Sequence, residues 1–254
     1  MYNYNKKFYA DLSEKTVFQR DILEKVHRLI IILEYINSNP GLEGMLALKG
    51  GTAINLTVFN LPRLSVDIDL DFSSNASREE MLVNRDSINA LLKKYFESEG
   101  YTIDPKSKTH FSLDSWVIKY TNTSGNPDKI KVEINYSLRQ HMLPIEKRGT
   151  GTDIFTLERK IFCLSKIELL RKCVIFYKLI SSEEKNINYD TSVIDKLSKY
   201  KIGTDLYPML RKKEPFDLEV SKHTVKAFID NVMTVNSDEK QYIERFMTIM
   251  WSST

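Results

Sequence analysis

Residues 48–72 read LKGGTAINLTVFNLPRLSVDIDLDF, and this stretch decides the fold. It ends with Asp67, Asp69 and Asp71 at a spacing of two residues, and apolar residues alternate with these acids. Such alternation indicates a β-strand, because successive side chains of a strand point to opposite faces. We therefore expect the three carboxylates to share one face of a strand, about 6.6 Å apart along the chain.

Three carboxylates on one strand face repel one another, so a purely structural strand gains little from them. A divalent cation relieves the repulsion, since hard cations prefer oxygen ligands. Two such ions about 3.5–4 Å apart can hold a nucleoside triphosphate (NTP) for in-line attack. The pattern thus predicts that Asp67, Asp69 and Asp71 bind Mg²⁺ or Mn²⁺ and that an NTP is the substrate. The alternative interpretation is a tight turn followed by a solvated acidic strand.

The glycine pair Gly50-Gly51 is separated from Asp67 by fifteen residues. Glycine has no Cβ, so the backbone at this pair can approach phosphate groups closely. Thr52 is expected to begin a helix, and the amide groups and dipole of a helix N-terminus favour anions. We therefore predict that Lys49, the glycine pair and Thr52 bind the nucleotide.

The order Gly-Gly, then Asp-x-Asp on a strand, resembles the signature of the DNA polymerase β-like nucleotidyltransferase superfamily. The strings K-G-G-T-A and L-P-R-x-S-x-D-x-D-x-D-F resemble the AbiEii/AbiGii toxin family, to which MenT-type toxins are related. This resemblance implies a nucleotidyltransferase that is the toxin of a bacterial toxin–antitoxin or phage-abortive-infection system. It also implies a cognate antitoxin as a partner.

Some members of this family add nucleotides to the 3′ end of tRNA, so the resemblance implies transfer of a nucleoside monophosphate (NMP) from an NTP to RNA. Two alternatives remain open at this point. One is transfer to a hydroxyl group of a protein or small molecule. The other is a non-catalytic nucleotide-binding module with the same fold.

The resemblance assigns roles to further residues. In the family an arginine and a serine, here Arg63 and Ser65, precede the metal strand, and both are candidates to contact the triphosphate. The alternatives are a salt bridge for Arg63 and an ordinary strand hydroxyl for Ser65. Polymerase β-like sites usually take a third carboxylate from a neighbouring strand, and Glu133 in K-V-E-I-N is the candidate catalytic acid. Asp71 competes for that role, and pairing of Glu133 with Lys131 or Lys119 is the structural alternative.

The phrase L-S-K-I-E-L-L-R-K resembles a second conserved region of the family, in which a lysine reaches the nucleotide phosphates. Lys172 matches that catalytic position, Lys166 is the second choice, and a solvated helix face is the alternative. The chain lacks the Arg-Asp-x-x-Asp string that relatives commonly carry next. Asp190 or Asp195 is a possible replacement for the missing acid, although Asp190 also suits a helix N-cap.

Composition limits the classes of function. Lys and Arg number 37 against 34 Asp and Glu, giving a net charge of +3, so any nucleic-acid surface is local. A basic tract at residues 196–213 with interleaved aromatic residues is one candidate for RNA contact, and ordinary solvated helix ends are the alternative.

We expect Cys163 and Cys173 to be core thiols inside one apolar helix. The chain shows no apolar leader and no run of 18 apolar residues, which predicts a cytoplasmic protein with no membrane span.

The expected fold class is α/β, with a mixed, mostly antiparallel sheet of the nucleotidyltransferase type flanked by helices and followed by a helical C-terminal domain. We place a nucleotidyltransferase catalytic domain at residues 1–150 and the helical domain at residues 151–254. Periodicity and capping signals predict the elements. Helices are expected over residues 14–37, 52–60, 78–98 and from about 158 onward, and strands over 45–48, 66–72, 101–104, 110–121 and 129–136.

Overall fold

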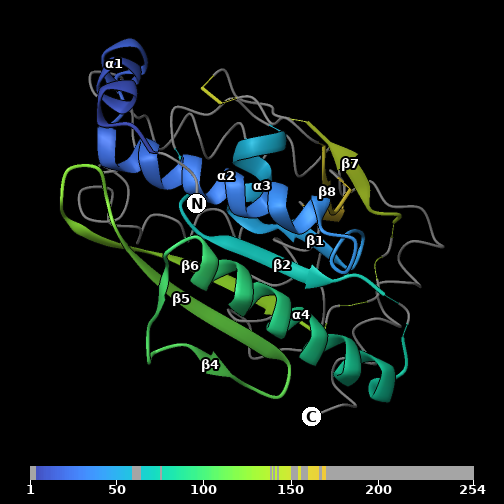
Figure 1. Ribbon diagram of the computed structural model, residues 1–254. Coiled ribbons are helices and arrows are strands. Elements are labelled where there is room, and N and C mark those ends of the chain that lie inside the picture. Colours follow the sequence, from blue (N-terminus) through green and yellow to red (C-terminus); the bar gives the residue numbers. More distant parts are fainter. Residues whose placement is uncertain are drawn as a thin grey trace, which may run out of the picture.

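The computed structural model describes residues 4–58, 64–74, 76–137, 139, 141, 143–149, 154–155, 160–165 and 168–169. Its strands form one eight-stranded sheet in the order β3-β5-β6-β2-β1-β8-β7, with β4 also paired to β5. The pairs β2–β6 and β1–β8 are parallel, and the other described pairs are antiparallel. The predicted mixed, mostly antiparallel α/β sheet is therefore confirmed (Figure 1).

The centre of the sheet follows the predicted strands closely. Its strands are β1 (Leu46–Lys49), β2 (Ile68–Phe72), β5 (Leu113–Thr121) and β6 (Pro127–Asn135). The hairpin of β5 and β6 joins β2 through β6, as the alternating patterns predicted. The shorter strands lie toward the two edges: β3 (Thr102–Ile103), β4 (Lys108–Thr109), β7 (Glu146–Arg148) and β8 (Ile161–Cys163).

Four described helices accompany this sheet: α1 (Lys6–Thr16), α2 (Arg20–Ser38), α3 (Gly50–Thr57) and α4 (Arg78–Ser98). The span of α4 matches the prediction, because Ser77 and Glu80 form a capping box at its start. None of the described helices is long and apolar enough to cross a membrane.

The helix predicted over residues 14–37 is confirmed from Arg20 onward, as α2, and is wrong at its start, because the chain turns between α1 and α2. Val17 adopts the left-handed conformation with φ 63°, and its N–H donates to the carbonyl of Ser13. The turn buries Phe18 completely. Helical spacing continues across the break, so the hydrophobic pattern alone does not show it.

The helix predicted from about residue 158 is also wrong at its start, where the chain forms β8. Leu48 of β1 pairs with Cys163, and both Ile161 and Cys163 are fully buried. A short apolar run does not distinguish a buried strand from a helix by its periodicity. Strand β8 lies beyond the domain boundary predicted at residue 150 and still belongs to the sheet. Cys163 is a free, buried thiol, and burial raises its pKa to about 12; Cys173 lies outside the described residues.

The alternation of β2 and β6 gives the sheet two unlike faces. Ile68, Leu70 and Phe72 of β2 are buried together with Val132 and Ile134 of β6. Helices α2 and α4 cover this apolar face, and α4 lies in front of β5 and β6 in Figure 1. The acids of β2 alternate with these residues and therefore belong to the other face.

Buried ion pairs fasten the two covering helices to the β5–β6 hairpin. On α2, Glu24 accepts hydrogen bonds from Arg28 through one oxygen and from Thr123, in the hairpin turn, through the other. On α4, Arg85 makes a two-point contact with Asp114 of β5, at 2.9 and 2.5 Å. These contacts fix β6 relative to the helices, and the adjacent β2 is fixed through β6.

Replacing Asp114 with alanine should destabilise the fold by about 3–5 kcal/mol, because it leaves the Arg85 guanidinium buried without its counter-charge. Urea denaturation followed by circular dichroism measures the free energy of unfolding. Asp86→Ala, at an exposed position on the same helix, is the control and should change stability by less than about 0.5 kcal/mol. Equal effects of the two substitutions would contradict this role for the pair.

Candidate active site

A row of polar side chains crosses four adjacent strands on the face opposite α2 and α4. Lys49 of β1 pairs in register with Asp69 of β2, Asp69 with Glu133 of β6, and Glu133 with Ser115 of β5. Residues paired in register project to the same face of a sheet. The structure therefore brings together Lys49, Asp69 and Glu133, which the sequence predicted from separate motifs.

Asp69 is the electrostatic centre of this row. Burial raises the pKa of its carboxyl, and the neighbouring Glu133 raises that pKa further. Lys49 opposes the shift, Asp67 adds to it, and Lys131 opposes it. Three carboxylates, those of Asp67, Asp69 and Glu133, thus lie around one half-buried space. The two neighbouring lysines offset their repulsion only in part.

The three acids of the strand differ in depth. Asp67 is exposed, Asp69 is half-buried and Asp71 is fully buried. The Nζ atom of Lys49 lies 2.5 Å from Oδ1 of Asp71. Asp71 was predicted to bind metal, and in the structure its carboxylate has the ammonium group of Lys49 as partner. The structure favours Asp71 as the residue that holds Lys49 in the row.

Glu133 has two neighbours of opposite charge. It lies beside Asp69 across the parallel β2–β6 pair, and its Oε1 is 2.8 Å from Nζ of Lys131. The pairing of Glu133 with Lys131, which the sequence left as an alternative, is therefore present. Glu133 also lies next to the acidic strand. Lys131 was not predicted to belong to the site, although alternation in K-I-K-V-E-I-N places it on the same face as Glu133.

Gly50 connects this row to the N-terminus of α3. Its φ is +69°, and a Cβ added there would lie 2.7 Å from Oδ2 of Asp69. Glycine is thus required by the backbone conformation and by the approach of the Asp69 carboxylate. Gly51 is exposed, and its added Cβ would make only an ordinary contact, at 3.6 Å from Oγ of Ser65. Lys49 is the N-cap residue of α3, and its side chain makes no capping hydrogen bond.

Thr52 and Ser65 tie α3 to the segment that leads into β2. The buried Thr52 hydroxyl lies 2.7 Å from Oγ of Ser65 and also within hydrogen-bonding reach of the Asp67 carbonyl. The N–H of Ser65 donates to Oδ1 of Asn55 at 3.1 Å. The Thr52 and Ser65 side chains therefore contact each other and help to position Asp67 beside the helix N-terminus.

The acids of the row supply carboxylate oxygens, the kind of ligand that Mg²⁺ and Mn²⁺ prefer. Among the residues with described placement, no three His, Cys, Asp or Glu side chains are grouped closely enough to hold an ion by themselves. Mg²⁺ in nucleotide sites is usually held by one or two carboxylates plus substrate phosphates and water, rather than by a protein cage. Asp69 and Glu133, with Asp67 at the start of the strand, fit that kind of donor set.

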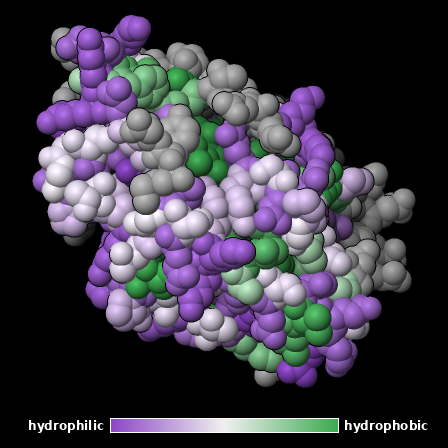
Figure 2. Space-filling model, in the orientation of Figure 1, coloured by the Kyte–Doolittle hydropathy of each residue, from purple (hydrophilic) through white to green (hydrophobic). Residues whose placement is uncertain are grey.

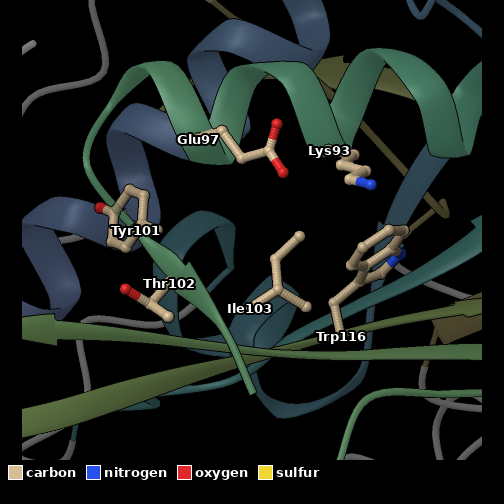
Figure 3. A pocket seen from close by; sticks show the side chains of 6 residues that line it. All are labelled: Lys93, Glu97, Tyr101, Thr102, Ile103 and Trp116. Atoms are coloured by element: carbon tan, nitrogen blue, oxygen red, sulfur yellow. The ribbon is translucent and has the colours of Figure 1, made fainter. Parts of the chain in front are cut away.

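A hollow of about 550 Å³ lies elsewhere, between α4 and the strands β3 and β5. Figure 3 shows the side chains around it: Lys93, Glu97, Tyr101, Thr102, Ile103 and Trp116. Trp116 packs against Phe96 of α4 and alternates with Ser115, so the hollow and the polar row lie on opposite faces of the sheet. The hollow is therefore separate from the candidate active site.

Several predicted site residues lie outside the described part of the chain. These are Arg63, Lys166, Lys172, Asp190 and Asp195, as well as the basic tract at residues 196–213.

In the charged segment after β6, the Nε2 atom of His141 lies 3.0 Å from Oγ of Ser73, and its Nδ1 atom lies 3.6 Å from the buried Glu168. This part of the loop is thus held against the sheet, at the end of β2.

Comparisons with known proteins identify a family and a similar fold. A family model described as the nucleotidyl transferase AbiEii toxin of type IV toxin–antitoxin systems matches residues 31–170, which is more than half of the chain and includes the whole polar row. Among solved structures, MenT4, a nucleotidyltransferase toxin from Mycobacterium tuberculosis, is similar with a TM-score of 0.60 and 11% sequence identity. The match covers 97% of this chain and 94% of that chain, and at this identity it shows the fold alone. No curated protein matches the sequence.

The two neighbouring glycines should respond differently to substitution by alanine. Gly50→Ala should lower the free energy of unfolding by about 2 kcal/mol or more, because a left-handed conformation costs an L-residue about 1–2 kcal/mol and the new Cβ meets Asp69. Gly51→Ala should be neutral or slightly stabilising, since alanine is favoured over glycine within a helix. Thermal and urea unfolding of both variants provide the measurement, and a neutral Gly50→Ala would contradict the close approach to Asp69.

Proposed function

The chain belongs to the AbiEii family of nucleotidyltransferase toxins, and we propose that it transfers an NMP from an NTP to the 3′ end of tRNA. The observation that carries the proposal is the row Lys49–Asp69–Glu133 beside Gly50 at the start of α3. It combines carboxylates with an uncapped helix N-terminus, which suits a triphosphate and its cation. A cognate antitoxin and a cytoplasmic location, where tRNA and NTPs occur, are parts of the same proposal.

In this proposal, Asp67 and Asp69 hold Mg²⁺ or Mn²⁺ and Glu133 is the third acid. When bound, the ion neutralises charge on the triphosphate and its leaving pyrophosphate. The carboxylate of Glu133 is the group that receives the proton from the attacking ribose hydroxyl. The N–H groups of Gly50 and Gly51 contact phosphate oxygens, and Lys49 supplies a fixed positive charge beside Asp69. Catalysis then consists mainly of positioning and charge stabilisation.

Arg63, Lys172 and one of Asp190 and Asp195 remain proposed members of the same site. Arg63 would present its planar donor group to the phosphates, and Lys172 would add a second cation. Thr52 and Ser65 act on the segment before β2, because their hydroxyls contact each other and lie next to the Asp67 carbonyl. Their proposed contribution to nucleotide binding is therefore to place Asp67 at the helix N-terminus.

The test is incubation of the purified protein with each of the four α-³²P-labelled NTPs, total tRNA and Mg²⁺, followed by gel separation. Label should enter tRNA, should be lost on addition of EDTA, and should return with excess Mg²⁺ or Mn²⁺. Label in a protein or a small molecule instead of tRNA would assign a different acceptor. Absence of any transfer with every NTP and ion would contradict the proposed reaction.

Asp67→Asn and Asp69→Asn should each lower the transfer rate by about a hundredfold or more, because each removes a carboxylate that would hold the cation that neutralises the reacting phosphates. Asp86→Asn, on the exposed side of α4, is the matched control and should leave the rate unchanged. Growth inhibition on expression in bacteria gives an independent measure. Full toxicity of folded Asp69→Asn protein would favour a non-catalytic nucleotide-binding module.

The Asp71–Lys49 pair predicts non-additive kinetics. Lys49→Met and Asp71→Asn should each lower kcat about tenfold or more, and the double variant should be little worse than Lys49→Met, since Asp71 acts through Lys49. Steady-state kinetics with labelled NTP measures kcat and KM, and urea denaturation of each variant separates lost stability from lost catalysis. Fully additive effects on kcat would show that Asp71 acts independently of Lys49.

The exposed Gly51 provides a test of phosphate contact that is separate from stability. Gly51→Ala leaves room for its Cβ in the protein but places a methyl group where the backbone would face the triphosphate. The KM for NTP should rise about tenfold or more while the melting temperature is unchanged or slightly higher. An unchanged KM would remove Gly51 from the nucleotide site.

A further inference from the structure

Four lysines share one side of the β4–β5–β6 part of the sheet, and we call them the lysine face: Lys108, Lys119, Lys129 and Lys131. The register fixes this arrangement. Lys119 pairs directly with Lys129, Lys108 pairs with Ser115, and Ser115 pairs with Glu133. Lys129 and Lys131 alternate with the buried Ile130 and therefore project to the same face as Glu133.

The lysine face is accessible. The side chains of Lys119 and Lys131 are 52% and 46% exposed, and Lys108 and Lys129 are exposed as well. Helices α2 and α4 pack on the other side of the hairpin, through residues such as Tyr120 and Trp116. A large ligand can thus reach the lysine face without displacing either of these helices.

The arrangement has a cost for the free protein. Side chains directly opposite each other on antiparallel strands have Cβ atoms about 4.5–5.5 Å apart, and like charges at that distance are destabilising. Lys119 and Lys129 form such a pair. Asp104 lies 2.6 Å from Lys119 and Glu133 lies 2.8 Å from Lys131, so the repulsion is only partly offset. A bound polyanion would relieve it, as a cation would relieve the repulsion among the acids.

The lysine face is continuous with the polar row. Lys131 is two residues from Glu133 on β6, about 6.6 Å along the strand, and Lys129 is about 13 Å away. A chain molecule whose end reaches Asp69 and Glu133 can therefore extend over the lysines. Lysine is a flexible point charge suited to phosphate groups, and contacts to phosphates position a nucleic acid without reading its sequence.

We propose that the lysine face binds the sugar–phosphate backbone of the acceptor RNA and directs its 3′ end to the polar row. This inference rests on the proposed function, because it takes RNA as the acceptor. It places the RNA on the catalytic half of the chain, in addition to the candidate basic tract at residues 196–213. The face supplies affinity and orientation, and the polar row performs the reaction.

The experiment measures binding of fluorescently labelled tRNA by anisotropy at several salt concentrations, with no NTP present. The variant is Lys108→Gln with Lys129→Gln, because neither lysine forms an ion pair with a described residue. Its Kd should rise about tenfold at low salt, and the slope of log K against log salt should fall by about 2, one per lysine. Adding Lys119→Gln should lower the slope by about one more.

Lys93→Gln with Lys94→Gln is the matched control, since it removes the same charge from α4 on the other face. It should leave both Kd and slope unchanged. Lys131 is not substituted, because it contacts Glu133. Binding of each labelled NTP, measured without RNA, should be the same in all variants, and melting curves should show that each variant is folded at the temperature of the assay.

Equal loss of affinity in the control, or no loss in the double and triple variants, would overturn the inference. So would a loss confined to an acidic polypeptide probe such as poly-glutamate, which would assign the face to a protein partner. The transfer reaction is scored separately with the unsubstituted protein, and Asp69→Asn is its inactive control. Failure of the proposed function therefore appears as absent transfer by the unsubstituted protein, and failure of this inference appears as unchanged tRNA binding by the lysine variants.

Discussion

The proximity of Asp69 and Glu133 is the constraint on which the rest of the site depends. Two carboxylates held side by side on neighbouring strands are unfavourable for folding, and partial burial increases the cost because it removes water from both. Burial of the apolar side chains on the other face of these strands offsets that cost. A register slip by one residue would turn Ile68, Leu70 and Phe72 out of the core and the acids into it. The hydrophobic core thereby fixes the distance between the two acids.

The position of Asp69 also determines which residue can occupy the junction of β1 and α3. Lys49 ends a buried strand, and the next residue must turn the chain into a helix directly beside Asp69. Only glycine allows both the positive φ and the contact with the carboxylate. The glycine motif therefore has a role inside the protein itself, before any phosphate is considered. Thr52 and Asn55 of α3 then hydrogen-bond to the backbone of the segment that leads into β2.

Much of this arrangement can be predicted from local patterns, and the errors have identifiable causes. Alternation predicts which residues share a face, so the acidic strand, the β5–β6 hairpin and the place of Glu133 follow from the sequence. Alternation does not give depth, and so it does not reveal that Asp67 is exposed whereas Asp71 is buried against Lys49. The turn at Val17 and the strand at Ile161–Cys163 depend on long-range packing, which a local pattern does not contain.

Not every exposed feature deserves a functional interpretation. Figure 2 shows apolar surface over the N-terminal half of α4, where Leu82 and Val83 are 43% and 67% exposed. Single exposed apolar residues are common in proteins and imply no partner. The lysine face differs because its charges are of one sign, lie in register and adjoin the polar row. One face of the sheet thus carries the acids of the polar row and, beside them, the lysine face. The like charges within each cluster repel one another, which is unfavourable for folding. In the proposed reaction, a cation with its triphosphate would neutralise the first and an RNA backbone would neutralise the second, so a single transfer reaction would account for both.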